Sequence, residues 1–120
     1  ARVALGTEVS PYFTNDSKLS AELLKLSENE YDPLWPLPLY LPYEKLLNST
    51  LADINNIGST GFGGAITAAL FLKSFVTNDI PWVHLDVYAW NASAAAGKPK
   101  GGEAMGIRTV FEYLVKKYSK

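Results

Sequence analysis

The chain of 120 residues is 48% hydrophobic and 19% charged, carries a net charge of −1 and contains no cysteine. This composition is typical of a folded globular unit and excludes intrinsic disorder, a disulfide framework and an electrostatic basis for binding nucleic acid. No apolar run approaches the roughly 18 residues of a membrane span. We expect residues 1–120 to form one unit without an internal boundary. Because the first residues already have the pattern of a strand, we expect the unit to be part of a longer polypeptide.

The N-terminal 29 residues predict a short strand and then a surface helix. Arg2–Thr7 is largely apolar and ends beside a glycine, which favours a strand that Pro11 then interrupts. Asp16 and its polar neighbours supply the chemistry of a helix N-cap. Leucines recur at helical spacing through about Asn29, at Leu19, Leu23 and Leu26.

Four prolines fall within Asp32–Pro42. Such a density excludes a helix interior and disfavours a central strand. The apolar residues between the prolines indicate packing, and a proline-rich recognition ligand is the alternative. Pro42 suits the first turn of a short helix that runs through Leu47.

The stretch Gly58–Trp90 organises the chain. Its glycine turn precedes an apolar helix, Ala65–Val76, and a strand, Trp82–Tyr88. A helix that is apolar nearly all round is typical of the interior of a large protein, and a strand covered on both faces is typical of a sheet with helices on each side. The predicted fold is therefore α/β, three-layer α/β/α, with a mixed central sheet. At Gly63–Gly64 we favour close helix packing over anion binding by free N–H groups.

A loop and a helix follow the strand. Glycine and proline make regular structure improbable over Asn91–Gly102. The last helix is expected to begin near Glu103, with its polar residues in water. Its apolar stripe consists of Ala104, Ile107, Phe111, Leu114, Val115 and Tyr118. Before the glycine turn, Asp53 and Asn56 favour turn chemistry over a role at the edge of a site.

His84 and Asp86 are candidates for chemistry, because alternation places them on one face of the strand, about 7 Å apart. A metal site needs further ligands that no histidine or cysteine spacing in the chain provides. A satisfied core histidine is therefore favoured, and a small enzyme that uses His84 and Asp86 remains an alternative. No cysteine or G-x-S-x-G motif supports nucleophilic catalysis.

Several motifs together carry a resemblance to a known family. The order GGAITAALFLKSFV and then PWVHLDV resembles the C-terminal signature of the leucyl aminopeptidases, the cytosol aminopeptidases with two metal ions. The segments WPLPLYLPYEKLL, LADINNIG and GEAMGIRTVFEYL resemble further stretches of that family, as does VALG, where the family has a strand. The resemblance covers essentially the whole chain but only the C-terminal part of the family's catalytic domain.

In this family, two divalent ions, Mn or Zn, activate a water molecule that attacks the peptide bond. The family's ligand segments read like K-x-x-x-x-D-x-K and N-T-D-A-E-G-R, and both would precede Ala1. The resemblance thus assigns no catalytic residue and no metal ligand to this chain. It does imply that Tyr88, Ala89 and Trp90 form part of the wall of the substrate pocket. The segment after HLD is two residues shorter than the family pattern, which indicates a divergent branch.

The resemblance implies that the chain is the C-terminal portion of a cytoplasmic metallo-aminopeptidase, which would be inactive alone. The expected partners are the N-terminal remainder of the same protein, a peptide substrate and further copies in a homo-hexamer, and neither nucleic acid nor a membrane. The alternative is a non-catalytic α/β interaction domain that kept the fold and lost the metal site.

Overall fold

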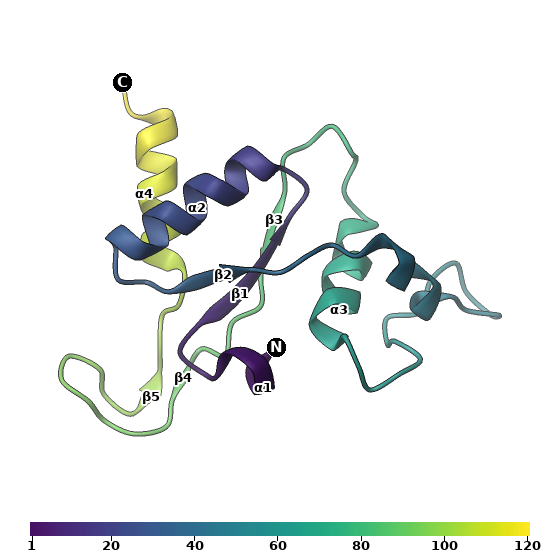
Figure 1. Cartoon of the computed structure of the whole chain (residues 1–120), viewed down its shortest axis with the longest axis horizontal. Coiled ribbons are helices and arrows are strands. Elements are labelled where there is room, and N and C mark those ends of the chain that lie inside the picture. Colours follow the sequence, from purple (N-terminus) through teal and green to yellow (C-terminus); the bar gives the residue numbers. More distant parts are fainter.

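The computed structural model describes all 120 residues and shows an α/β chain with two small sheets (Figure 1). In chain order the elements are α1 (Arg2–Leu5), β1 (Ser10–Thr14), α2 (Ser17–Asn29), β2 (Leu34–Pro36), η1 (Leu41–Leu47), α3 (Gly64–Lys73), β3 (Val83–Leu85), β4 (Trp90–Asn91), β5 (Gly101–Gly102) and α4 (Ile107–Tyr118). No helix is long and apolar enough to cross a membrane.

The main sheet has the strand order β2-β1-β3, with β1 parallel to β2 and antiparallel to β3. The predicted α/β fold with a mixed sheet is therefore confirmed. The proline-rich segment supplies β2, which is an edge strand of this sheet. Proline is tolerated in an edge strand because its missing N–H can lie on the side that has no neighbouring strand.

The prediction of a strand at Arg2–Thr7 is wrong, because this segment forms α1, which ends at Gly6 with φ 76°. The central strand β1 instead covers the segment around Pro11, where the sequence predicted a break. Pro11 is tolerated because pairing with β3 begins only at Tyr12. The carbonyl of Pro11 still accepts a hydrogen bond from the Asp86 N–H at 3.0 Å.

Helix α2 agrees with its prediction and covers one face of the sheet. Asp16 caps it by accepting from the N–H groups of Lys18 and Leu19 at 2.9 and 3.0 Å. The core between helix and sheet consists of Tyr12, Leu19, Leu23 and Leu34. The Tyr12 hydroxyl donates to the Ser20 carbonyl at 2.7 Å. Burial raises the pKa of this phenol, and a hydrogen bond with the Ser20 side chain offsets only part of that rise.

Helices α3 and η1 pack together beside the sheet, at the right of Figure 1. The η1 helix carries Pro42 in its first turn, as predicted. Gly63, at φ 66°, is the N-cap residue of α3, and an added Cβ there would lie 2.9 Å from the Tyr43 ring. The structure thus confirms close packing at this glycine.

Two predictions in the C-terminal third are wrong in detail. Asn91–Gly102 was predicted to be a loop, but its two ends belong to the short antiparallel strands β4 and β5. Glycine does not prevent this pairing, because a two-residue ladder needs only backbone hydrogen bonds and no packed side chains. The last helix begins at Ile107, four positions after Glu103, because Gly106 at φ 79° occupies the N-cap position.

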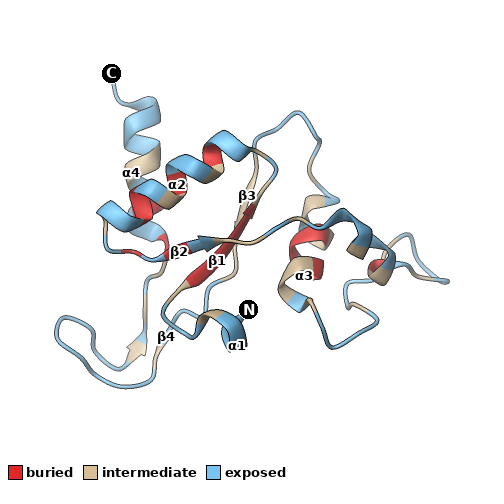
Figure 2. Ribbon diagram, viewed as in Figure 1, coloured by how far each residue is buried: buried red, intermediate tan, exposed pale blue.

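The apolar stripe of α4 points away from α2. Its exposed members are Ile107, Phe111, Leu114, Val115 and Tyr118, whereas Thr109 is fully buried. Only 16 of the 120 residues are buried, which Figure 2 shows as short red segments in α2, β1 and α3. The radius of gyration, 15.9 Å, exceeds the roughly 13.5 Å of a compact domain of this length. The chain therefore leaves large apolar surfaces uncovered.

Candidate functional site

The segment that follows β3 contains the three residues that the sequence predicts for a pocket wall. Tyr88 and Trp90 are partly exposed, at 39% and 48%. Ala89 has φ 54°, a left-handed conformation that is unfavourable for a residue with a Cβ. Its carbonyl accepts the N–H of Glu103 at 3.1 Å, and Trp90 pairs with Gly102. The turn at Ala89 thus redirects the chain from β3 into the β4–β5 ladder.

Tyr88 and Trp90 line two different clefts. The Tyr88 cleft has a volume of about 230 Å³ and is shared with α1 and Asp86. There the Arg2 guanidinium lies 5.3 Å from the centre of the Tyr88 ring, at the distance of a cation–π contact. The Trp90 cleft has a volume of about 190 Å³ and also contains Asp32, Lys98, Glu103 and Arg108. In this structure Ala89 lines neither cleft.

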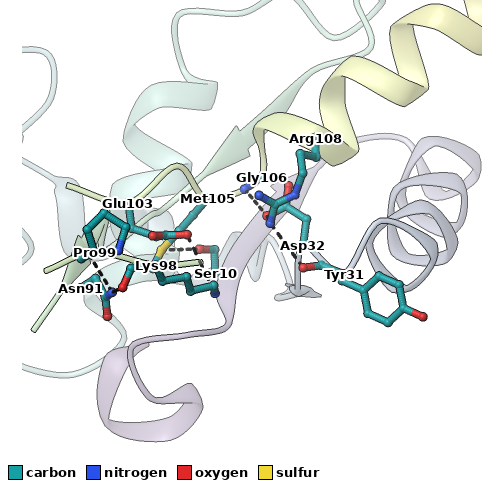
Figure 3. A network of polar contacts seen from close by, with 10 residues as sticks. All are labelled: Ser10, Tyr31, Asp32, Asn91, Lys98, Pro99, Glu103, Met105, Gly106 and Arg108. Atoms are coloured by element: carbon teal, nitrogen blue, oxygen red, sulfur yellow. Dashed lines mark hydrogen bonds and ion pairs between the residues drawn. The ribbon is translucent and has the colours of Figure 1, made fainter. Parts of the chain in front are cut away.

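Asp32 is the centre of a polar network that joins β2 to the start of α4 (Figure 3). One carboxylate oxygen accepts from the Gly106 N–H at 2.8 Å, and the other accepts from the Thr109 N–H at 3.1 Å. The Thr109 hydroxyl donates to the Asp32 carbonyl at 3.3 Å. The Arg108 guanidinium lies 3.6 Å from the same carboxylate, whose side chain is only 3% exposed. These contacts satisfy two of the free N–H groups at the start of α4 and balance the buried charge.

Sequence reasoning missed this role of Asp32. Asp32 stands before Pro33 in a segment interpreted only as proline-rich, and its partner Gly106 lies 74 positions away. A Ser, Thr, Asp or Asn directly before α4 would have been the usual signal, but glycine stands there. No local pattern could therefore have identified the pairing.

The β4–β5 hairpin has side-chain contacts in addition to its backbone ladder. The Asn91 amide donates to the carbonyls of Lys98 and Pro99 at 3.0 and 2.9 Å. Lys98 lies 3.9 Å from the Glu103 carboxylate. All these contacts lie within the hairpin, so they shape it without fixing its place on the sheet.

His84 lies among aromatic rings. Its imidazole stacks with Phe13 at a centroid distance of 6.0 Å and with Trp82 at 6.1 Å. No ion pair joins it to Asp86, which lines the Tyr88 cleft instead. No group of three or more His, Cys, Asp or Glu side chains could hold a metal ion.

Two other residues considered from the sequence lie in an exposed turn. Asp53 and Asn56 are both exposed, and neither lines a cleft described above. Beside them, Asn55 accepts the Ile57 N–H at 3.1 Å, which is turn chemistry of the predicted kind.

The mixed sheet, the helix that covers it and the order of the motifs together define an α/β protein of the kind that the sequence predicted. The sequence model of the cytosol aminopeptidase family, catalytic domain, matches residues 1–111. This chain belongs to that family, as the sequence motifs predicted.

Solved structures and curated relatives agree. The chain is similar to the crystal structure of the cytosol aminopeptidase from Coxiella burnetii, with a TM-score of 0.93 and 47% identity over 98% of this chain. It is also similar to a tomato leucine aminopeptidase mutant, with a TM-score of 0.81 and 37% identity over 96% of this chain. The probable cytosol aminopeptidases of Nitratidesulfovibrio vulgaris and Rickettsia typhi are 42% and 38% identical over 93% and 98% of this chain.

The chain spans only part of each of these proteins. It covers 26% of the Coxiella burnetii chain and 22% of the tomato chain. It covers 22% and 24% of the Nitratidesulfovibrio vulgaris and Rickettsia typhi proteins.

Proposed function

We propose that this chain is the C-terminal portion of the catalytic domain of a metal-dependent leucyl-type aminopeptidase, which removes N-terminal residues from peptides. The observation that carries the proposal is the match of residues 1–111 to the family's catalytic domain. The TM-score of 0.93 to the Coxiella burnetii cytosol aminopeptidase supports it.

The uncovered apolar surfaces support a place within a larger domain. The apolar stripe of α4 is exposed, as are Phe62 and Phe75 beside α3, and contiguous exposed apolar residues mark surfaces that bind other parts of a protein. We propose that the N-terminal remainder of the catalytic domain covers part of this surface. Residues 1–120 then form one continuous portion of that domain. A homo-hexamer and a cytoplasmic location follow from the family and are part of the proposal.

Within the enzyme, this chain provides sheet core and pocket wall. Two divalent ions, Mn or Zn, would be held by segments outside these residues and would supply the activated water. Tyr88, Ala89 and Trp90 would contact the side chain of the N-terminal residue of the substrate. They lie beyond the end of β3, where ligands of open α/β sheets usually bind. In the complete domain, the N-terminal remainder would cover the Tyr88 cleft and the Trp90 cleft or join them into one pocket.

A metal-dependence assay on the intact protein tests the proposal. Hydrolysis of a chromogenic leucine amide should be lost after chelation and restored by Mn²⁺ or Zn²⁺. Absence of turnover in folded, metal-supplied protein would refute the enzyme and favour the non-catalytic interaction domain. Turnover that survives complete chelation would refute the metal mechanism.

A further inference from the structure

We propose that Asp32 is a positioning residue that fixes the backbone of Ala89 and Trp90 through residues 102–106. The inference rests on the proposed function, because Ala89 and Trp90 matter to catalysis only as part of the pocket wall. Asp32 lines the Trp90 cleft, but its polar partners are Gly106, Thr109 and Arg108 and none of the three wall residues. It acts at a distance, by holding the segment to which the wall is hydrogen-bonded.

The first step is that the wall cannot hold its own position. Strands β4 and β5 have two residues each, and a short isolated hairpin is marginally stable in water. The side-chain contacts of the hairpin are internal to it. The position of Trp90 therefore depends on whatever anchors the chain on either side of the ladder.

The second step is that the segment after β5 contacts both the end of β3 and the wall. At one end, the Glu103 N–H donates to the Ala89 carbonyl at 3.1 Å. At the other end, Gly106 packs so closely on Leu85, the last residue of β3, that an added Cβ would lie 2.4 Å from its Cδ2 atom. The chain leaves the sheet after Leu85 and turns at Ala89. A shift of residues 103–106 would thus disturb both the point where the chain leaves the sheet and the turn within the wall.

The third step is that Asp32 anchors this segment to the sheet. It lies two residues before β2 and binds Gly106 and Thr109 with separate carboxylate oxygens. The other polar contact, from the Ser10 hydroxyl to the Met105 sulfur at 3.5 Å, is weak. Asparagine at position 32 could accept from only one of the two N–H groups and would also lose the charge that pairs with Arg108.

The experiment compares Asp32→Asn with Asp16→Asn in the intact protein. Asp16 caps α2 by accepting both N–H groups with a single carboxylate oxygen, and the amide oxygen of asparagine can still do this. Asp16→Asn therefore makes the same chemical change at a helix cap without removing a cap bond, and it leaves the wall untouched. The first readout is hydrogen exchange of the Glu103 amide, which reports the bond to Ala89 directly. The second is kcat and KM for peptides with N-terminal leucine or alanine, which a general loss of stability would not alter selectively.

Asp32→Asn should speed Glu103 exchange by about tenfold, the factor that corresponds to one hydrogen bond. It should lower the leucine-to-alanine ratio of kcat/KM by about tenfold, mainly through KM for the larger side chain. Asp16→Asn should change neither readout. Equal behaviour of the two variants in either readout would overturn the proposal.

Two further outcomes are also decisive. If Asp32→Asn fails to fold, Arg108→Met keeps both carboxylate bonds of Asp32 and removes its charge partner, together with the Arg108 hydrogen bond to the Tyr31 carbonyl, at a half-exposed position. It should move both readouts in the same direction by a smaller factor, and unchanged values would overturn the proposal. Absence of turnover in the wild-type protein would refute the proposed function and the wall role with it. The exchange of Glu103 would then still decide whether Asp32 holds residues 103–106.

Discussion

Gly106 offers the sharpest test of how the start of α4 is built, because two physical terms oppose a side chain there. Its φ of 79° lies in the left-handed region, which costs an L-residue roughly 1–2 kcal/mol. An added Cβ would also lie 2.4 Å from Leu85 Cδ2, and displacing that side chain into the packed core costs about 1 kcal/mol or more. Gly106→Ala should therefore destabilise the protein by about 2–3 kcal/mol.

Two other glycines separate these terms. Gly97 has a φ of 72° with nothing within 4 Å of an added Cβ, so Gly97→Ala tests the conformational term alone and should cost about 1 kcal/mol. Gly102 has neither a left-handed φ nor a close neighbour, and Gly102→Ala should be neutral within about 0.5 kcal/mol. Urea unfolding of the three variants of the intact protein measures the series.

The expected order of destabilisation is Gly106→Ala, then Gly97→Ala, then Gly102→Ala. If Gly106→Ala and Gly97→Ala lower the free energy of unfolding equally, the Leu85 side chain moves away without an energetic penalty, and its close approach to Gly106 does not add to the destabilisation. A cost at Gly102 as large as that at Gly106 would show that the whole hairpin region resists side chains. Either result would refute the reasoning from local geometry.

Four further expectations follow from the contacts described. His84→Gln should lower the melting temperature through lost ring stacking and reduce peptide turnover only modestly; a loss beyond about a thousandfold without a stability change would indicate direct catalysis. Tyr88→Ala should shift kcat/KM toward larger N-terminal residues by about tenfold, and an unchanged profile with lowered stability would assign Tyr88 to the core. Burial raises the pKa of Tyr12 in the folded protein, so the neutral phenol stabilises the fold fully below about pH 10, and this stabilisation is lost as the pH rises further. The difference in melting temperature between wild type and Tyr12→Phe should therefore become smaller above about pH 10. Calorimetry of residues 1–120 with Mn²⁺ or Zn²⁺ should show no tight stoichiometric site, and two such sites would contradict the assignment of the ligands to other segments.

Local signals were sufficient for some elements of this chain. The helix at Ser17–Asn29 has its own N-cap, Asp16, and its own leucine periodicity, and it formed where both indicated. The short helix at Pro42 likewise needs only the fixed φ of proline in its first turn. The mixed sheet was also predicted, although not from any single strand.

Elements that depend on distant partners were not predictable in the same way. Arg2–Leu5 and Ser10–Thr14 are both short apolar segments, and local sequence favoured a strand in the first. The pairing of Tyr12 with Leu85 and of Ser10 with Leu34 decides that the second is the central strand. A proline next to the start of that strand is costly only when its missing N–H faces a partner, which the sequence alone does not reveal.

The candidate site shows the same division between local and distant information. The assignment of Tyr88–Trp90 to a pocket wall came from the family resemblance and stays a prediction, and in our proposal the geometry of this stretch depends on a carboxylate in another part of the chain. Asp32 acts as the cap of α4 from 74 positions away, so it replaces the local capping residue that the helix lacks. A sequence pattern can mark where a pocket wall begins, but the residue that holds the wall is recognised only when the fold brings the two together. The exposed apolar stripe of α4 can likewise be explained only by a partner that the local sequence does not name. Under our proposal the N-terminal remainder of the catalytic domain packs against this stripe.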